Sequence, residues 1–188
     1  MNIPSSSEIA NAGITTVLGA NRNNKDYIKN NFSALVTDVQ VEAYRAYQAA
    51  EGLACGKAIE DYFRTLLPNE PSATDVFQLM RDRFLILDRF FLSLTQSRRT
   101  RAGAAFEIVV TTLFTVLEYP HTAQPEIAGS RPDYILPSIE HYHNFATDCI
   151  VFTCKRTLRE RWRQVITEGM TGQAFFLGHV DKRDSQTV

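Results

Sequence analysis

An aspartate and a lysine stand at the ends of two consecutive strand-like segments. Asp133 opens a short apolar segment that stops at Pro137, and Lys155 closes a β-branched and aromatic run that begins at Asp148. Side chains at neighbouring strand ends lie close together, so these two groups can meet at one edge of a sheet. Carboxylate oxygens suit Mg²⁺, and a lysine beside them can orient a water molecule or stabilise a pentacovalent phosphate. The pair therefore indicates phosphoryl transfer, which depends on positioning and electrostatics.

A metal site of this kind needs a second acid. The position two residues before the lysine holds Thr153, which is a poor metal ligand. Glu168 stands 13 residues after Lys155, late in a predicted helix, and can fold its carboxylate back over the sheet edge. Glu107 lies in an apolar helix predicted over 104–119. It is either a partly exposed residue of the helix face or a carboxylate that points at a metal.

Basic side chains are concentrated in two short stretches. The formal net charge is only −1, yet eight of the 20 Lys and Arg residues fall within Arg98–Arg101 or Lys155–Arg163. Such local clusters set the field that a polyanion meets. The second stretch leads into a helix predicted over 158–170, whose polar start can enter a DNA groove. The alternative for both stretches is a solvated charged surface, since exposed charge is common.

The elements that must carry these groups begin with helices. We expect an arm with short helical pieces over residues 1–34, then two helices over 38–51 and 53–67, broken near Gly52. A capping box at Ser72-x-x-Asp75 opens a long helix. The apolar stripe of that helix is predicted to lie in the core, and it consists of Phe77, Met80, Phe84, Leu87, Phe91 and Leu94.

The second half of the chain reads as an α/β arrangement. A polar, basic hinge over 96–103 precedes the apolar helix, and short strands follow at Asp133 and before Lys155. The basic helix comes next, and the last strand is predicted over 173–180. His141 and His143 lie in the predicted connecting loop, but they lack further ligands at a zinc-site spacing, so a zinc site is not favoured.

Composition sets broad limits on the class of protein. With 188 residues and 44% apolar content, the chain can bury one core, as one domain or one domain with a helical extension. Its three cysteines lie in apolar or strand-like contexts, which is typical of reduced thiols in a cytoplasmic protein. We expect no membrane association, because no apolar run approaches the ~18 residues of a membrane span and no signal sequence is evident.

The spacing of these groups resembles that of one enzyme family. Pro132-Asp133, Lys155 and Glu168 are similar to the rearranged PD-(D/E)XK site of EcoRII/PspGI-like type II restriction endonucleases, which cut CCGG, CCNGG and CCWGG sequences. The resemblance extends over Lys155-x-x-x-Arg159-Glu160-Arg161-Trp162-Arg163-Gln164 and over Arg99-x-Arg101-Ala102-Gly103-x-x-x-Glu107. It implies a PD-(D/E)XK core with a mixed central sheet flanked by helices. Residues 96–188 would form this catalytic core, and 1–95 a helical region for DNA contact or dimerisation.

The resemblance also implies a catalytic role for each acid and for the lysine. Asp133 and Glu168 would ligate Mg²⁺, Glu107 would be an outer acid near a second metal ion, and Lys155 would serve the attacking water and the scissile phosphate. The product would carry a 5′-phosphate.

DNA recognition would fall to the basic stretches. Arg159, Glu160 and Arg161 would read the outer base pairs, because arginine donates two hydrogen bonds to guanine and glutamate accepts one from cytosine. Gln96 would lie near the inner base pairs. Backbone contacts would come from Arg98, Arg99, Arg101 and Arg163. A homodimer would read both halves of a palindrome in double-stranded DNA, with a cognate methyltransferase as genetic partner.

Three other interpretations remain open from the sequence. A repair or junction-resolving PD-(D/E)XK nuclease would share Asp133 and Lys155 without needing the Arg159–Arg161 base reader. A DNA-binding protein without catalytic activity would use the same helix and ignore Mg²⁺. A purely structural ion pair between Lys155 and Glu168 is the third. Relatives generally continue through another strand and helices, whereas this sequence stops at Val188, so we expect a minimal or truncated version of the fold.

Overall fold

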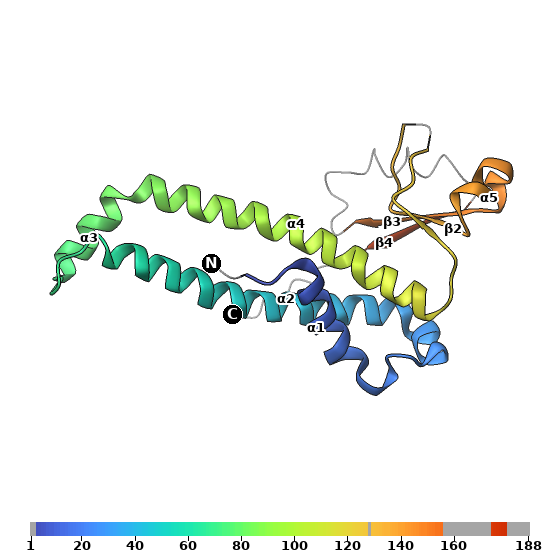
Figure 1. Cartoon of the computed structure of the whole chain (residues 1–188), viewed down its shortest axis with the longest axis horizontal. Coiled ribbons are helices and arrows are strands. Elements are labelled where there is room, and N and C mark those ends of the chain that lie inside the picture. Colours follow the sequence, from blue (N-terminus) through green and yellow to red (C-terminus); the bar gives the residue numbers. More distant parts are fainter. Residues whose placement is uncertain (1–2, 128, 156–173, 180–188) are drawn as a thin grey trace.

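A long helical hairpin is joined at one end to a small sheet (Figure 1). The computed structural model describes residues 3–127, 129–155 and 174–179. Its helical part consists of α1 (Ser6–Leu18), the 3-10 turn η1 (Gly19–Asn21), α2 (Lys25–Arg64), α3 (Ala73–Asp82) and α4 (Phe84–Val116). No helix in these described ranges is long and apolar enough to span a membrane.

The sheet has four strands in the order β1-β2-β3-β4. They are β1 (Thr122–Ala123), β2 (Tyr134–Leu136), β3 (Ile150–Lys155) and β4 (Ala174–His179), and α5 (Ile139–Asn144) and η2 (Ala146–Asp148) connect β2 to β3. The first three strands pair antiparallel, whereas β4 runs parallel to β3. The α/β prediction, with a mixed sheet beside helices, is thereby confirmed.

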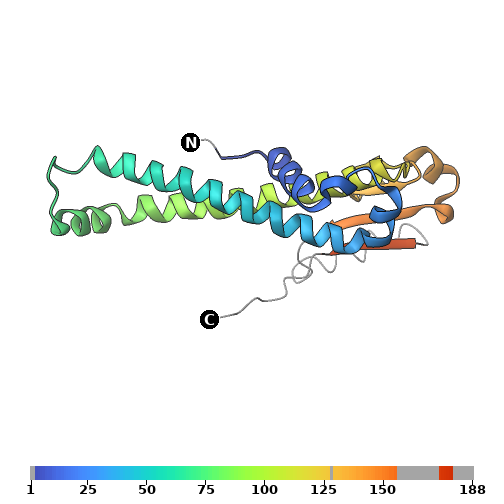
Figure 2. The same ribbon diagram turned by 90° about the horizontal axis from the view of Figure 1, so that it is seen from below.

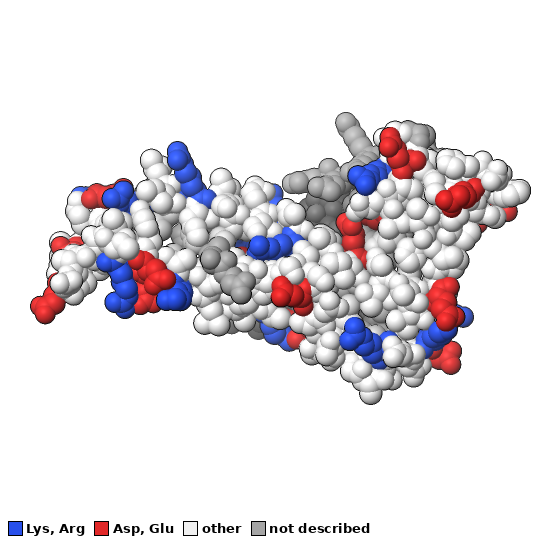
Figure 3. Space-filling model, viewed as in Figure 1, with Lys and Arg blue, Asp and Glu red and all other residues white. Residues whose placement is uncertain are grey.

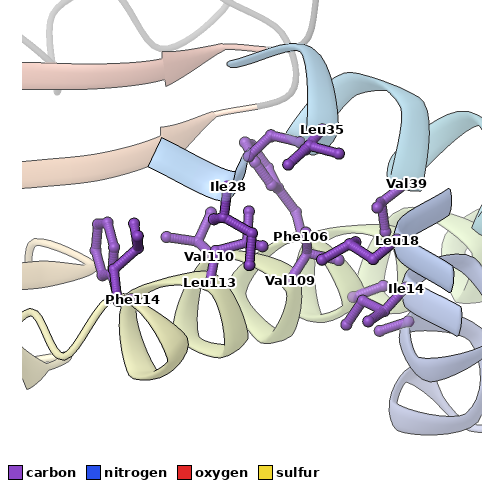
Figure 4. Packing of buried hydrophobic residues seen from close by; sticks show 14 of the residues in the cluster. Ile14, Leu18, Ile28, Leu35, Val39, Phe106, Val109, Val110, Leu113 and Phe114 are labelled. Carbon is purple, nitrogen blue, oxygen red and sulfur yellow. The ribbon is translucent and has the colours of Figure 1, made fainter. Parts of the chain in front are cut away.

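The main core lies where α1, α2 and α4 meet the sheet. Alternation along the strands sends Tyr134 and Phe152 towards α4, while Ile135 and Val151 pack on the other face with α5 residues. Figure 4 shows the apolar side chains of the three helices converging, and they include Ile14, Leu18, Ile28, Leu35, Val39, Phe106, Val109, Val110 and Leu113. The arm predicted at the N-terminus thus supplies part of the core.

Local sequence signals explain where the helices begin. Ser5 and Glu8 form a capping box at α1, and the predicted box of Ser72 and Asp75 is present at α3. Asn24 caps α2 by accepting a hydrogen bond from the backbone N–H of Tyr27.

Two predicted helix breaks are wrong. Helix α2 runs for 40 residues through Gly52, and α4 runs through the segment 96–103 that was predicted to be a hinge. A glycine inside a helix costs only about 1 kcal/mol, which tertiary packing and the rest of a long helix offset. The proposed division after residue 95 consequently falls inside α4. His141 and His143 likewise lie in α5 and not in a loop.

The long helix predicted from Ser72 is instead two helices, α3 and α4, which are separated at Arg83. Its predicted core stripe is mostly exposed. Of its residues, Leu94 is buried, but Phe77 and Phe84 are 70% and 65% exposed. None of the residues from 56 to 93, all of which the structure describes, is buried. We call residues 53–93 the hairpin tip. Figure 2 shows it as a narrow projection away from the sheet, and Figure 3 shows acidic and basic side chains interspersed on the face in view.

The contact between α1 and α2 depends on Gly13. A Cβ atom there would lie 2.7 Å from the carbonyl oxygen of Val39 and 3.0 Å from the Cβ of Ala43. We expect Gly13→Ala to lower the free energy of unfolding by about 1–3 kcal/mol, because α1 must shift away from α2. Thermal denaturation measures this loss, at roughly 2–4 °C per kcal/mol for a chain of this length.

Gly56→Ala is the matched control, because nothing lies within 4 Å of a Cβ atom at that position in α2. This substitution should stabilise the protein by roughly 0.5–1 kcal/mol through helix propensity alone. Equal stabilisation by both substitutions would contradict the close contact.

Candidate active site

Asp133 is tied to the end of the strand that carries Lys155. It directly precedes β2, and the antiparallel register of β2 and β3 places it beside Thr153. Its Oδ2 accepts hydrogen bonds from the Thr153 hydroxyl at 3.0 Å and from the Cys154 backbone N–H at 2.6 Å. Lys155 is the last residue of β3. The backbone thus brings the predicted acid and lysine positions to one end of the sheet.

Thr153 has a role that the sequence did not suggest. It occupies the position where a second metal-binding acid was sought, and its side chain is fully buried. Instead of offering an oxygen to a metal, its hydroxyl donates to the Asp133 carboxylate. Two donors on one oxygen fix the orientation of the carboxylate, as a group that binds a cation requires.

Glu107 joins the same network from the helical side. It lies on α4, and its Oε2 accepts a hydrogen bond from Gln124 Nε2 at 2.9 Å. The backbone N–H of Gln124 donates to the Asp133 carbonyl oxygen at 2.8 Å. Sequence reasoning named both acids but missed Gln124, and no residue pattern around Gln124 marks it out.

Tyr134 connects this part of α4 to the sheet. Its hydroxyl donates to the Glu107 carbonyl oxygen at 2.7 Å and contacts the Thr111 hydroxyl at 2.9 Å. Burial raises the pKa of Tyr134, so the phenol stays protonated, and can donate, to a higher pH than an exposed tyrosine. The hydrogen bond from this buried phenol therefore holds the backbone of α4 at Glu107 close to β2.

The predicted DNA-contact residues on α4 lie along its middle, towards the hairpin tip. Gln96 and Arg99 are exposed to solvent. Arg98 is also partly exposed, but it pairs with the buried carboxylate of Glu51 on α2, with Nε and Nη2 both 2.6 Å from Oε2. Arg101 donates to the Tyr47 hydroxyl at 3.4 Å, and its guanidinium lies 5.9 Å from the centre of the Tyr47 ring. Arg98 and Arg101 therefore join α4 to α2.

Buried polar groups surround this helix contact. Tyr47 donates a hydrogen bond to Glu51 at 2.5 Å, and burial is the main cause that raises the pKa of Tyr47. A buried carboxylate is costly unless charged and hydrogen-bonding partners surround it. Glu51 has both kinds of partner, which explains why an acid is tolerated inside the helix interface.

Several predicted site residues fall outside the described part of the chain. They are Glu168 as the third acid, and Arg159, Glu160, Arg161 and Arg163 on the basic helix. Within the described ranges, no three His, Cys, Asp or Glu side chains are close enough to hold a metal ion. Asp133 and Glu107 nevertheless offer the carboxylate oxygens that a hard divalent cation prefers.

Solved structures with a similar fold are restriction endonucleases bound to DNA. Metal-depleted Ecl18kI with uncleaved, modified DNA gives a TM-score of 0.80 at 22% identity, covering 97% of this chain and 64% of that one. PspGI with its substrate DNA gives 0.61 at 21% identity, covering 92% of this chain and 69% of that one. These similarities establish the shared fold.

Sequence comparison leads to a named family. The type II restriction enzyme SsoII of Shigella sonnei is 28% identical over 167 residues, which is 80% of this chain and 53% of SsoII. EcoRII of Escherichia coli is 30% identical over 101 residues, half of this chain and 25% of EcoRII. The chain thus spans about half the length of SsoII. The model of the EcoRII C-terminal domain matches residues 73–181, more than half of the sequence. The chain therefore belongs to the EcoRII C-terminal family.

Proposed function

We propose that the chain is a Mg²⁺-dependent, sequence-specific endonuclease of double-stranded DNA, built on a PD-(D/E)XK core. The observation that carries this proposal is the Asp133 carboxylate, held by two hydrogen bonds at the end of the strand that terminates in Lys155. The matched relatives SsoII and EcoRII are type II restriction enzymes, which supports the same reaction class.

Asp133, Glu168 and Glu107 are the proposed metal ligands. A bound Mg²⁺ supplies charge neutralisation on the phosphate and activates water at neutral pH. Lys155 orients the attacking water and stabilises negative charge on the scissile phosphate. Thr153 and the Cys154 backbone N–H keep the Asp133 carboxylate in one orientation. The 3′-oxygen leaves in line and the product keeps a 5′-phosphate.

The proposed recognition site is a short CCGG, CCNGG or CCWGG palindrome. Arg159, Glu160 and Arg161 read the outer G·C pairs from the major groove, and Gln96 reads the inner pairs. PspGI and Ecl18kI were solved with DNA bound, which supports a DNA partner. Backbone contacts are assigned to Arg98, Arg99, Arg101 and Arg163. Among those on α4, Arg99 is best placed, because Arg98 and Arg101 already contact α2.

A homodimer is part of the same proposal, and the hairpin tip supports it. Exposed apolar patches larger than a few hundred Å² commonly mark protein interfaces. The tip carries many large exposed apolar side chains, namely Leu53, Leu66, Phe77, Met80, Phe84, Leu85, Ile86, Phe91 and Leu92.

A cytoplasmic location and a cognate methyltransferase as genetic partner complete the proposal.

Cleavage of defined duplexes tests the activity directly. Duplexes with CCGG, CCAGG or CCCGG sites should be cut at one of these sites with Mg²⁺ and left intact with chelator. Lys155→Ala should lower the rate by roughly 10²–10³-fold, the usual effect of removing one charge-stabilising donor. Lys29→Ala is the control, because Lys29 is an exposed lysine on α2 outside the hairpin tip. Specific binding without cutting under all conditions would instead identify a catalytically inactive DNA-binding protein.

Base readers and backbone contacts should respond differently to substitution. We expect Arg161→Ala to weaken binding to the cognate duplex by about 1–3 kcal/mol and to leave binding to unrelated DNA almost unchanged. Arg99→Ala should weaken both, and should reduce the slope of log K against log salt by about 0.9. Fluorescence anisotropy in chelator at several salt concentrations measures both effects. Equal losses on the two duplexes for Arg161→Ala would contradict its assignment as a base reader.

Association through the hairpin tip can be tested by mass. A dimer should have twice the 21.3 kDa mass of the chain. The double substitution Phe77→Ser, Phe84→Ser should yield monomers in sedimentation equilibrium without loss of folding, because both rings are mostly exposed. Phe145→Ser is the matched control, since Phe145 is 57% exposed beyond α5. A doubly substituted protein that stays dimeric would exclude the tip as the interface.

A further inference from the structure

Gln124 has a backbone conformation that side chains rarely adopt. It directly follows β1, and its φ of 49° lies in the left-handed region, where glycine is favoured. Gln124 is also exposed to solvent, so burial of its side chain does not explain why a residue other than glycine stands there. Its hydrogen bonds point to another explanation.

Gln124 makes three hydrogen bonds, two of which connect it to Asp133 and Glu107. Its backbone N–H donates to the Asp133 carbonyl oxygen at 2.8 Å, and its side-chain Nε2 donates to Glu107 Oε2 at 2.9 Å. Its carbonyl oxygen accepts from Arg131 Nε at 3.2 Å. One residue therefore contacts the backbone of the first acid and the carboxylate of the second.

The two contacts have different chemical consequences. The backbone hydrogen bonds continue the edge of the sheet and do not depend on the side chain. The amide donor, in contrast, restrains rotation of the Glu107 carboxylate. An ionised carboxylate can accept about four hydrogen bonds or metal contacts, so a hydrogen-bond donor and a cation can share it. Donors of this kind orient ligands and raise metal affinity.

We propose that Gln124 is a positioning residue that fixes the Glu107 carboxylate relative to Asp133 for binding of a divalent cation. This inference rests on the proposed function, because it takes both acids as metal ligands. It adds a residue outside the acids and the lysine, directly after β1.

Gln124→Gly separates this role from a purely structural one. Glycine keeps the backbone hydrogen bonds and relieves the left-handed strain, so the thermal midpoint should stay equal or rise. The amide donor is lost, so the affinity for Mn²⁺ should fall by roughly 10-fold or more. Isothermal titration of the full chain with Mn²⁺, without DNA, measures this affinity independently of cleavage.

Glu118→Gly is the matched control. Glu118 is also a non-glycine residue with a left-handed backbone, at φ 55°, but its carboxylate pairs with Lys25 at 2.6 Å. It should leave Mn²⁺ affinity unchanged. Asp133→Asn is the site control, and it should abolish binding.

The possible outcomes distinguish the positioning role of Gln124 from the proposed metal-binding function. Wild-type affinity in Gln124→Gly, together with loss in Asp133→Asn, overturns the positioning role and leaves the proposed function intact. A loss of affinity with a lower thermal midpoint in Gln124→Gly also overturns it, because the side chain would then support the fold. Equal Mn²⁺ binding by wild type and Asp133→Asn overturns the proposed function and this inference with it.

Discussion

Burial of one face of α4 is the constraint on which the candidate site depends. Val109, Val110 and Leu113 are fully inaccessible to solvent between α1, α2 and the sheet. Each such side chain contributes about 1.5–3 kcal/mol relative to exposure, so rotation of the helix about its axis is strongly opposed. With this rotation fixed, Glu107 has to face the end of β1, where Gln124 meets it. The hydrophobic core and the acid network are thus set by the same helix.

The sequence was most informative where local pattern decides structure. A β-branched run predicted the strand that ends in Lys155, and an aspartate before a short apolar segment predicted the start of β2. Both predictions are confirmed, because strand identity follows from residue type over a few positions. The hydrogen bonds of Thr153 and Gln124 were not predictable. They depend on strand register and on a left-handed backbone at position 124, and neither leaves a signature in residue type.

The errors concern long helices and have a common physical origin. Glycine at 52 and polar residues over 96–103 lower helix propensity only locally, whereas packing along a helix stabilises it over its whole length. The apolar stripe from Phe77 to Leu94 was predicted to be core, yet only Leu94 is buried. Periodicity shows that a helix face is apolar, but it carries no information about what covers that face. Assigning a stripe to the interior therefore needs knowledge of the neighbouring elements.

The ion pair between the buried Glu51 carboxylate and the partly exposed Arg98 also opposes sliding of α4 along α2. Arg98 lies nine positions before Glu107 on the same uninterrupted helix. Sliding α4 by one turn would displace Glu107 by about 5.4 Å. Its carboxylate would then leave the reach of Gln124, and Glu51 would lose its charged partner. The Glu51–Arg98 ion pair thus helps to keep α4 from sliding along α2. It thereby helps to hold Glu107 in place beside Gln124, although it does not contact Glu107.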